Sequence, residues 1–229
     1  MPASARAIPV PIAQTGTRLV PTDGGRSESV ADAAARHWLL AHAAGHVNDR
    51  IIASMLASQR AGLGAMPDWL GLTPAAFQDL IACHFPALRQ TRFPQPGRCL
   101  DPARSEERDE LVQLLLKHSE APTQGSAERN IDEPFAQSPS QQQRWMAGII
   151  AAGCLGSDHL WQDLGLRQRA ELSLLMTHNF PALAEKNRQD MKWKRFLYKQ
   201  LCETEGIYTC RSPSCEVCVD YHACFGPEN

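Results

Sequence analysis

The sequence lacks any apolar run that approaches the ~20 residues of a membrane-spanning helix, and residues 1–29 lack the apolar core of a signal peptide. It also lacks an excess of either charge, because 23 basic residues stand against 25 acidic ones. No global positive field therefore points to nucleic acid or to an anionic membrane as a partner. We expect a cytoplasmic protein that binds neither.

Several catalytic and structural patterns are absent as well. No stretch alternates apolar and polar residues with period two, so the sequence predicts an all-α fold rather than a sheet. There is no glycine-rich nucleotide loop, no radical-type CxxxCxxC and no nucleophile with an adjacent base. These absences argue against an enzyme, and a redox enzyme with an iron-sulfur centre stays open only as a third hypothesis.

Composition divides the chain into segments. Two of them are rich in Pro, Gly, Ser, Thr and Gln without periodicity and have too little apolar surface to offset the entropy of ordering. The predicted segments are a disordered tail (1–26), a first helical region (27–118), a linker (119–143), a second helical region (144–206) and a cysteine-rich loop (207–229).

Local signals place two of the predicted helices. TPAAFQDLIACHF opens with Thr73 as N-cap and Pro74 at the first helical position. Its apolar stripe is predicted at helical spacing and consists of Phe77, Leu80, Ile81 and His84. Ser140 followed by Gln143 forms a capping-box signature that begins another helix.

The second helical region repeats part of the first. Three short segments recur in the same order, with spacings that drift by a few residues. The pairs are Ile51-Ile52-Ala53 with Ile149-Ile150-Ala151, Leu70-Gly71-Leu72 with Leu164-Gly165-Leu166, and His84-Phe85-Pro86-Ala87-Leu88 with Asn179-Phe180-Pro181-Ala182-Leu183. We interpret this as a weak internal duplication in a helical scaffold, with chance similarity as the alternative.

A basic helix is predicted directly before the cysteine-rich loop, ending near Gly206. Its inward stripe is predicted to be Trp193, Phe196, Leu197, Gln200 and Leu201. Its other faces carry Lys192, Lys194, Arg195 and Lys199. These cations would favour nearby thiolates, dock an acidic partner or attract an oxyanion such as molybdate; the simpler interpretation is a solvated helix face.

Four of the eight cysteines lie close together near the C-terminus, with four, two and five residues between Cys210, Cys215, Cys218 and Cys224. In a reducing cytosol such a group indicates metal binding more than disulfides. Zinc sites usually use two close pairs separated by a dozen or more residues, and that separation is missing here. The spacing therefore favours an iron-sulfur type cluster, with structural zinc as the alternative.

Three further cysteines and a histidine lie near or outside this group. Cys83 and Cys154 lie in apolar helical stretches and are predicted to be small buried hydrophobes. Cys202 is either a core residue at the helix end or an additional ligand, and His222 either ligates or lies in solvent.

The segments SDHLWQDLGL, NRQDMKWKRFLYKQLC and CRSPSCEVCVDYHACFG resemble the NifQ proteins of nitrogen-fixing bacteria. The resemblance covers roughly 149–226 well, and the LGL to HFP stretch of the first half more loosely. It implies a carrier of a molybdenum-iron-sulfur cluster, with Cys210, Cys215, Cys218 and Cys224 as ligands. Such a carrier supplies molybdenum for the iron-molybdenum cofactor of nitrogenase.

The resemblance also implies partners, namely the NifEN scaffold and the nitrogenase reductase NifH, together with molybdate or another molybdenum source. It implies nothing about the tail or the 119–143 linker. The alternative from another class is a helical interaction module in which the cysteine loop is a structural zinc site.

Overall fold

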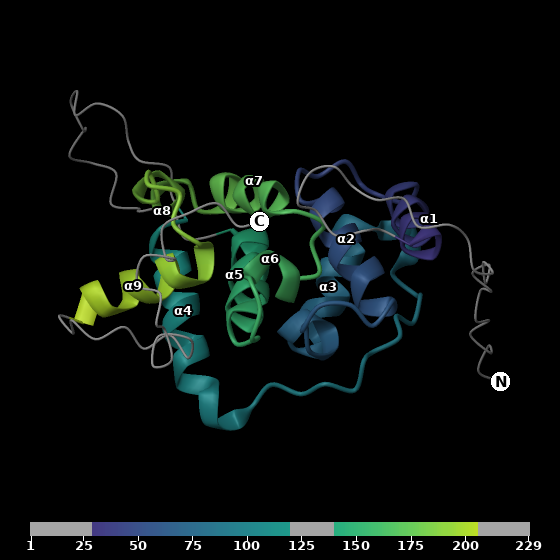
Figure 1. Cartoon of the computed structure of the whole chain (residues 1–229). Coiled ribbons are helices and arrows are strands. Elements are labelled where there is room, and N and C mark those ends of the chain that lie inside the picture. The colour runs from purple at the N-terminus through teal and green to yellow at the C-terminus, as the bar shows by residue number, and fades with distance from the viewer. Residues whose placement is uncertain (1–28, 120–139, 206–229) are drawn as a thin grey trace, which may run out of the picture.

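The computed structural model describes residues 29–119 and 140–205, and every regular element in these ranges is a helix (Figure 1). The all-α prediction is therefore confirmed for this part of the chain. The predicted tail (1–26) and cysteine-rich loop (207–229) lie outside it. The α-helices are α1 (Val30–Leu40), α2 (Asp49–Arg60), α3 (Pro74–His84), α4 (Ser105–Lys117), α5 (Gln141–Cys154), α6 (Leu160–Asp163), α7 (Arg169–Asn179), α8 (Pro181–Lys186) and α9 (Trp193–Glu205). The 3₁₀ helices are η1 (Asp68–Gly71), η2 (Pro86–Leu88) and η3 (Pro102–Arg104).

The predicted helix starts are present, and each follows from a side chain that satisfies a free backbone N–H. The Thr73 hydroxyl accepts a hydrogen bond from the Ala76 N–H at 3.2 Å, and Pro74 is the first residue of α3. Ser140 and Gln143 form the reciprocal capping box that begins α5. The last residues of the predicted linker thus already belong to α5.

α5 is the central helix, with α1, α2 and α3 on one side of it and α4 and α9 on the other (Figure 1). Every residue from Trp145 to Cys154 is buried, which is the pattern of a helix surrounded by other helices. Neither α5 nor any other helix of the described ranges is long and apolar enough to cross a membrane.

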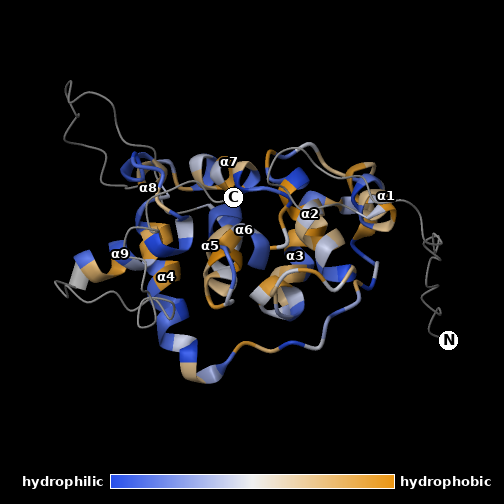
Figure 2. Ribbon diagram, in the orientation of Figure 1, coloured by the Kyte–Doolittle hydropathy of each residue, from blue (hydrophilic) through white to orange (hydrophobic). Residues whose placement is uncertain are grey.

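The two halves of the chain share a single hydrophobic core. α4, the last helix of the first half, packs along α5, the first helix of the second half, and one continuous cluster of buried side chains runs through both halves. Figure 2 shows the apolar residues on the helix sides that face one another. Neither half therefore encloses a separate core.

Backbone geometry repeats at the segments that recur in the sequence. Gly71 and Gly165 both have positive φ, at 76° and 73°. Phe85 and Phe180, which follow α3 and α7, have φ/ψ of −137°/66° and −136°/59°. The same local conformation at corresponding positions supports the internal duplication.

The two corresponding helix ends meet at the start of α2. Asn48 and Asn179 exchange a pair of amide hydrogen bonds of 2.9 and 3.0 Å, and the neighbouring Asp49 carboxylate contacts His84 Nδ1 at 2.6 Å. All four side chains are buried. Because buried polar groups are costly when unpaired, these contacts fix how the ends of α3 and α7 lie against α2.

We predict that Gly71→Ala destabilises the protein through two separable effects. The new residue would have to adopt positive φ, and its Cβ would lie far inside van der Waals contact of the Ala152 Cβ on α5. Gly62 has a φ of 72°, and a Cβ added there would meet nothing within 4 Å, so Gly62→Ala isolates the backbone cost of about 1–2 kcal/mol. In urea unfolding, Gly71→Ala should lose a further ~1–3 kcal/mol through overpacking; equal losses in the two variants would contradict this.

Candidate functional site

The predicted ligands Cys210, Cys215, Cys218 and Cys224, and also His222, lie outside the described residues. Within the residues that the structure describes, no three His, Cys, Asp or Glu side chains are arranged to hold a metal ion. α9 ends at Glu205, five residues before the first of the four cysteines. The described part of the candidate site is therefore α9, which precedes the cysteines in the chain, together with the residues that α9 contacts.

Lys194 anchors the beginning of α9 to the turn between α5 and α6. Its ammonium donates hydrogen bonds to the carbonyl oxygens of Gly156 (3.0 Å) and Asp158 (2.6 Å) and forms an ion pair with Asp163. The Lys194 and Asp163 side chains are only 11% and 1% exposed. Burial raises the pKa of the Asp163 carboxyl, and the Lys194 ammonium opposes that rise.

This contact corrects the prediction for the basic helix. The sequence pattern places Lys194 on a solvated or partner-facing side, but in the structure it is a largely buried structural cation, 11% exposed. Tyr198, one helical turn later, is also buried, at 1% exposure, and is absent from the predicted inward stripe. The i, i+4 spacing of Lys194 and Tyr198 is the available signal, since it places both polar tips on one face of α9.

Tyr198 anchors the middle of α9 to α4. Its hydroxyl donates a hydrogen bond to the Glu107 carboxylate, which also accepts two hydrogen bonds of 2.7 Å from Arg104. Arg104 in turn donates to the Leu155 carbonyl at 2.6 Å, just after α5. Burial alone would raise the pKa of Glu107, but the hydrogen bonds from Arg104 and Tyr198 bring it below its ordinary value. The carboxylate is thus held ionised between three elements.

The described cysteines differ in environment. Cys154 is fully buried, and burial raises the pKa of its thiol to about 12, so it is an inert core residue, as predicted. Cys202 is buried in the last turn of α9, which agrees with the first of its two interpretations, a core residue at the helix end. Cys83 is only partly buried, in contrast to the prediction, and Cys99 is exposed.

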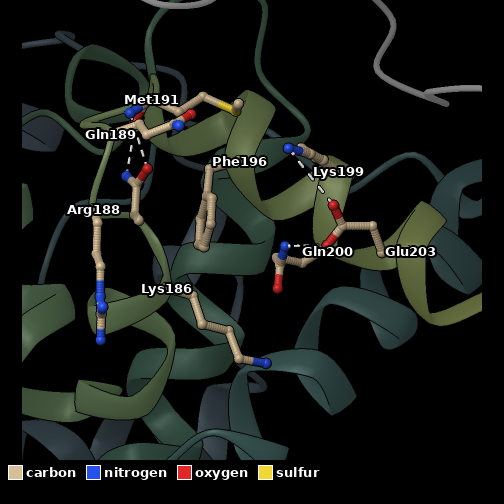
Figure 3. Close-up of a pocket in the computed structure, with 9 residues that line it drawn as sticks. Lys186, Arg188, Gln189, Met191, Phe196, Lys199, Gln200 and Glu203 are labelled. Carbon is tan, nitrogen blue, oxygen red and sulfur yellow. Dashed lines mark hydrogen bonds and ion pairs between the residues drawn. The ribbon is translucent and has the colours of Figure 1, made fainter.

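A cavity of about 500 Å³ lies against the outer side of α9 (Figure 3). It is lined by Lys186, Asn187, Arg188, Gln189, Met191, Phe196, Lys199, Gln200 and Glu203. Lys199 forms an exposed ion pair with Glu203 at 3.6 Å, and Glu203 also accepts a hydrogen bond of 2.6 Å from Gln200. Of the predicted basic residues, Lys199 therefore lines a pocket, while Lys194 is largely buried against the turn between α5 and α6.

A second polar cluster lies at the end of α3. The Asp49 carboxylate accepts hydrogen bonds from the Gly45 and His46 N–H groups at 2.7 and 2.8 Å, while its other oxygen contacts His84 Nδ1. The ring of His46 lies edge-on to that of His84, with Nε2 3.7 Å from the Cys83 sulfur. Burial lowers the pKa of His84, although Asp49 opposes the shift, so its ring is neutral at pH 7. This cluster closes the turn before α2.

The comparisons with known proteins agree on one family. The NifQ family model matches residues 51–226. Protein NifQ of Azotobacter vinelandii is 44% identical over 184 residues, covering 76% of this chain and 86% of that protein. Protein NifQ of Rhodobacter capsulatus is 35% identical over 178 residues, covering 78% and 87%. A NifQ homolog of Sinorhizobium fredii is 33% identical over 183 residues, covering 77% and 69%.

No solved structure shows significant similarity to the chain. An anchored helix that leads into four closely spaced cysteines is the arrangement expected of a metal-handling protein. The chain belongs to the NifQ family, since the family model spans most of its length and relatives above 30% identity cover three quarters of it.

We predict that Lys194→Met lowers the free energy of unfolding by about 3–5 kcal/mol, because it leaves the Asp163 carboxyl buried without its cation. Lys199→Met is the matched control: it removes the same group from an exposed pair on the same helix and should cost less than ~1 kcal/mol. Urea unfolding followed by circular dichroism measures both. Similar losses for the two lysines would contradict the structural role of Lys194.

We predict that His84 gives the protein a pH-dependent stability. Because burial holds the native pKa of His84 below 6.5, the unfolded chain binds more protons between the native pKa and about pH 6.5, and stability rises with pH there. His84→Asn removes the titrating ring and keeps a donor toward Asp49, so it should reduce the slope of this part of the profile; the pKa of His118 is also lowered, and its contribution remains. Urea titrations at about pH 5.5 and 7.5 test this, with the exposed His178→Asn as control. An unchanged slope in His84→Asn would refute the assignment.

Proposed function

We propose that the protein carries a molybdenum-iron-sulfur cluster on Cys210, Cys215, Cys218 and Cys224 and supplies molybdenum for the iron-molybdenum cofactor of nitrogenase. Membership of the NifQ family supports the broader part of this proposal, a role in molybdenum handling for that cofactor. The observation that supports the finer part is the position of the cysteine group, five residues after a helix that is tied to the core.

The chemistry of the four cysteines fits such a cargo. Thiolates are the ligands of iron-sulfur clusters, and each iron takes one thiolate. A cluster several ångströms across is accessible to a short cysteine segment at several corners, whereas a single zinc ion requires four sulfurs to converge on one small centre. These four cysteines lie in one close group and not in two pairs separated by a dozen or more residues, and this spacing favours a cluster.

The described body of the protein fits a carrier better than a zinc-stapled domain. A structural zinc site contributes folding energy outright, and small domains that need one lack a sufficient core. Here residues 29–119 and 140–205 enclose one continuous core, and α9 is held by Lys194 and Tyr198. This helical body therefore has a core of its own and does not need a metal in the following segment in order to fold.

A carrier must bind its metal and then release it, so we propose that the protein has no catalytic turnover of its own. We also propose that it acts in the cytoplasm. The NifEN scaffold and NifH are the proposed partners, and molybdate or another molybdenum compound is the proposed source. Ligands on a segment that follows the helical body can reach an acceptor without opening the core, which suits transfer.

We predict that Cys215→Ala and Cys218→Ala each abolish cluster binding without changing the helical content. The control is Cys99→Ala, because Cys99 is an exposed cysteine outside the C-terminal group. Proteins purified without oxygen are compared by iron, sulfide and molybdenum analysis, visible absorption and far-UV circular dichroism. Full iron and molybdenum content in Cys215→Ala would exclude the proposed ligands. One zinc per chain, no visible absorption and global unfolding on chelation would instead support the structural zinc alternative.

A further inference from the structure

The cavity beside α9 is lined by cations from three successive parts of the chain. Lys186 is the last residue of α8, Arg188 lies in the following loop and Lys199 lies on α9. Glu203 is the single carboxylate of this lining. In Figure 3 the Phe196 ring lies between Arg188 on one side and Lys199 with Glu203 on the other, and Lys186 lies below it.

The wall of this cavity is held in place by hydrogen bonds of its own. The Asn187 side chain donates to the Met191 carbonyl and accepts from the Met191 N–H, both at 2.9 Å. Arg169 binds both carboxylate oxygens of Asp190 at 2.9 and 2.7 Å. The negative charge of Asp190 is therefore neutralised by Arg169, and the loop that carries Arg188 has a fixed shape.

The cations of the lining are incompletely neutralised. Arg188 forms an ion pair with Glu185 at 2.9 Å, but the two side chains are 78% and 53% exposed, and such an exposed pair is weak. Lys186 Nζ contacts His118 Nε2 at 2.8 Å, and burial and the neighbouring lysines lower the pKa of His118, so Lys186 faces a neutral ring instead of a carboxylate. The pair Lys199–Glu203 is long, at 3.6 Å, and both side chains are about half exposed. Such exposed pairs are weak, so an anion can compete with Glu203 for Lys199.

The floor of the cavity strengthens the attraction for an anion. Met191 and Phe196 are 6% and 4% exposed, and an apolar surface on one side lowers the local dielectric and the screening of nearby charges. The volume of about 500 Å³ lies within the range of ~300–1,000 Å³ for small-molecule sites. The apolar floor favours a charged ligand with compensating cations around it, and the volume leaves room for an anion together with part of its hydration water.

We propose that this cavity binds a tetrahedral oxyanion of the molybdate class, with Lys186, Arg188 and Lys199 as its cationic contacts. The proposal rests on the proposed function, which requires a molybdenum source close to the cysteine segment. Lys199 lies on the helix that leads into that segment, six residues before the end of α9. The cavity is thus a docking site for the incoming anion, separate from the thiols that hold the cluster.

Equilibrium dialysis of molybdate against the metal-free full-length protein tests the site directly. Lys186→Gln combined with Lys199→Gln should weaken binding roughly tenfold or more, since each removes a charge-assisted contact. Glu203→Gln should tighten binding several-fold, because it removes the competing carboxylate. Arg60→Gln is the matched control: it deletes one exposed cation at the end of α2 and should leave binding unchanged. Equal affinities in all four proteins, or no saturable binding, would overturn the proposal.

Two further measurements separate this site from its alternatives. A variant with serine at all four C-terminal cysteines should bind molybdate as the wild type does; loss of binding would place the anion at the thiols and overturn the proposal. Tungstate should compete with molybdate better than sulfate or phosphate; the reverse order would show a general anion site and overturn the assignment to a molybdenum source.

Separate measurements test this inference and the proposed function, so the failure of one can be distinguished from the failure of the other. Iron and molybdenum content of protein purified without oxygen tests the carrier, whereas dialysis of metal-free protein tests the cavity. A protein that carries the cluster but fails to bind molybdate in the cavity would refute this inference alone. A protein that binds molybdate in the cavity but assembles no cluster would refute the carrier alone.

Discussion

The placement of α9 depends on one buried cation. The Lys194 ammonium satisfies two backbone carbonyls and the Asp163 carboxylate at the turn between α5 and α6. A largely buried ion pair contributes little net energy compared with an apolar contact of the same shape, but removing only one of its partners is costly. Its effect is therefore to specify a single position for α9. The helix could not slide or rotate by one residue without leaving a buried charge unpaired.

The Tyr198–Glu107–Arg104 contacts apply the same constraint one turn later, and from a different direction. Lys194 ties α9 to the end of α5, whereas Tyr198 ties it to α4. Two attachments on one face fix both the axis and the rotation of the helix. The opposite side of α9 is then free to line the cavity with Lys199, and the helix ends at Glu205, five residues before Cys210.

The start of α2 joins two helix ends whose segments recur in the sequence. Asn48 and Asp49 contact Asn179 and His84, which end the corresponding helices α7 and α3. Corresponding positions of the two recurring segments thus carry an amide, Asn179, and an imidazole, His84, and each contacts its own partner. Buried polar pairs of this kind distinguish two otherwise similar helix ends and specify their arrangement.

The sequence by itself determined the helical class, the starts of α3 and α5 and the buried character of Cys154, because these depend on local capping, periodicity and hydrophobicity. It also determined the family through the spacing of four cysteines and the segments that precede them. It did not determine the role of Lys194, since a lysine on an amphipathic helix is usually solvated and its partner Asp163 lies 31 residues away. Only tertiary packing brought that carboxylate and two backbone carbonyls to the ammonium, and only packing divided the basic residues of α9 between the interior and a cavity.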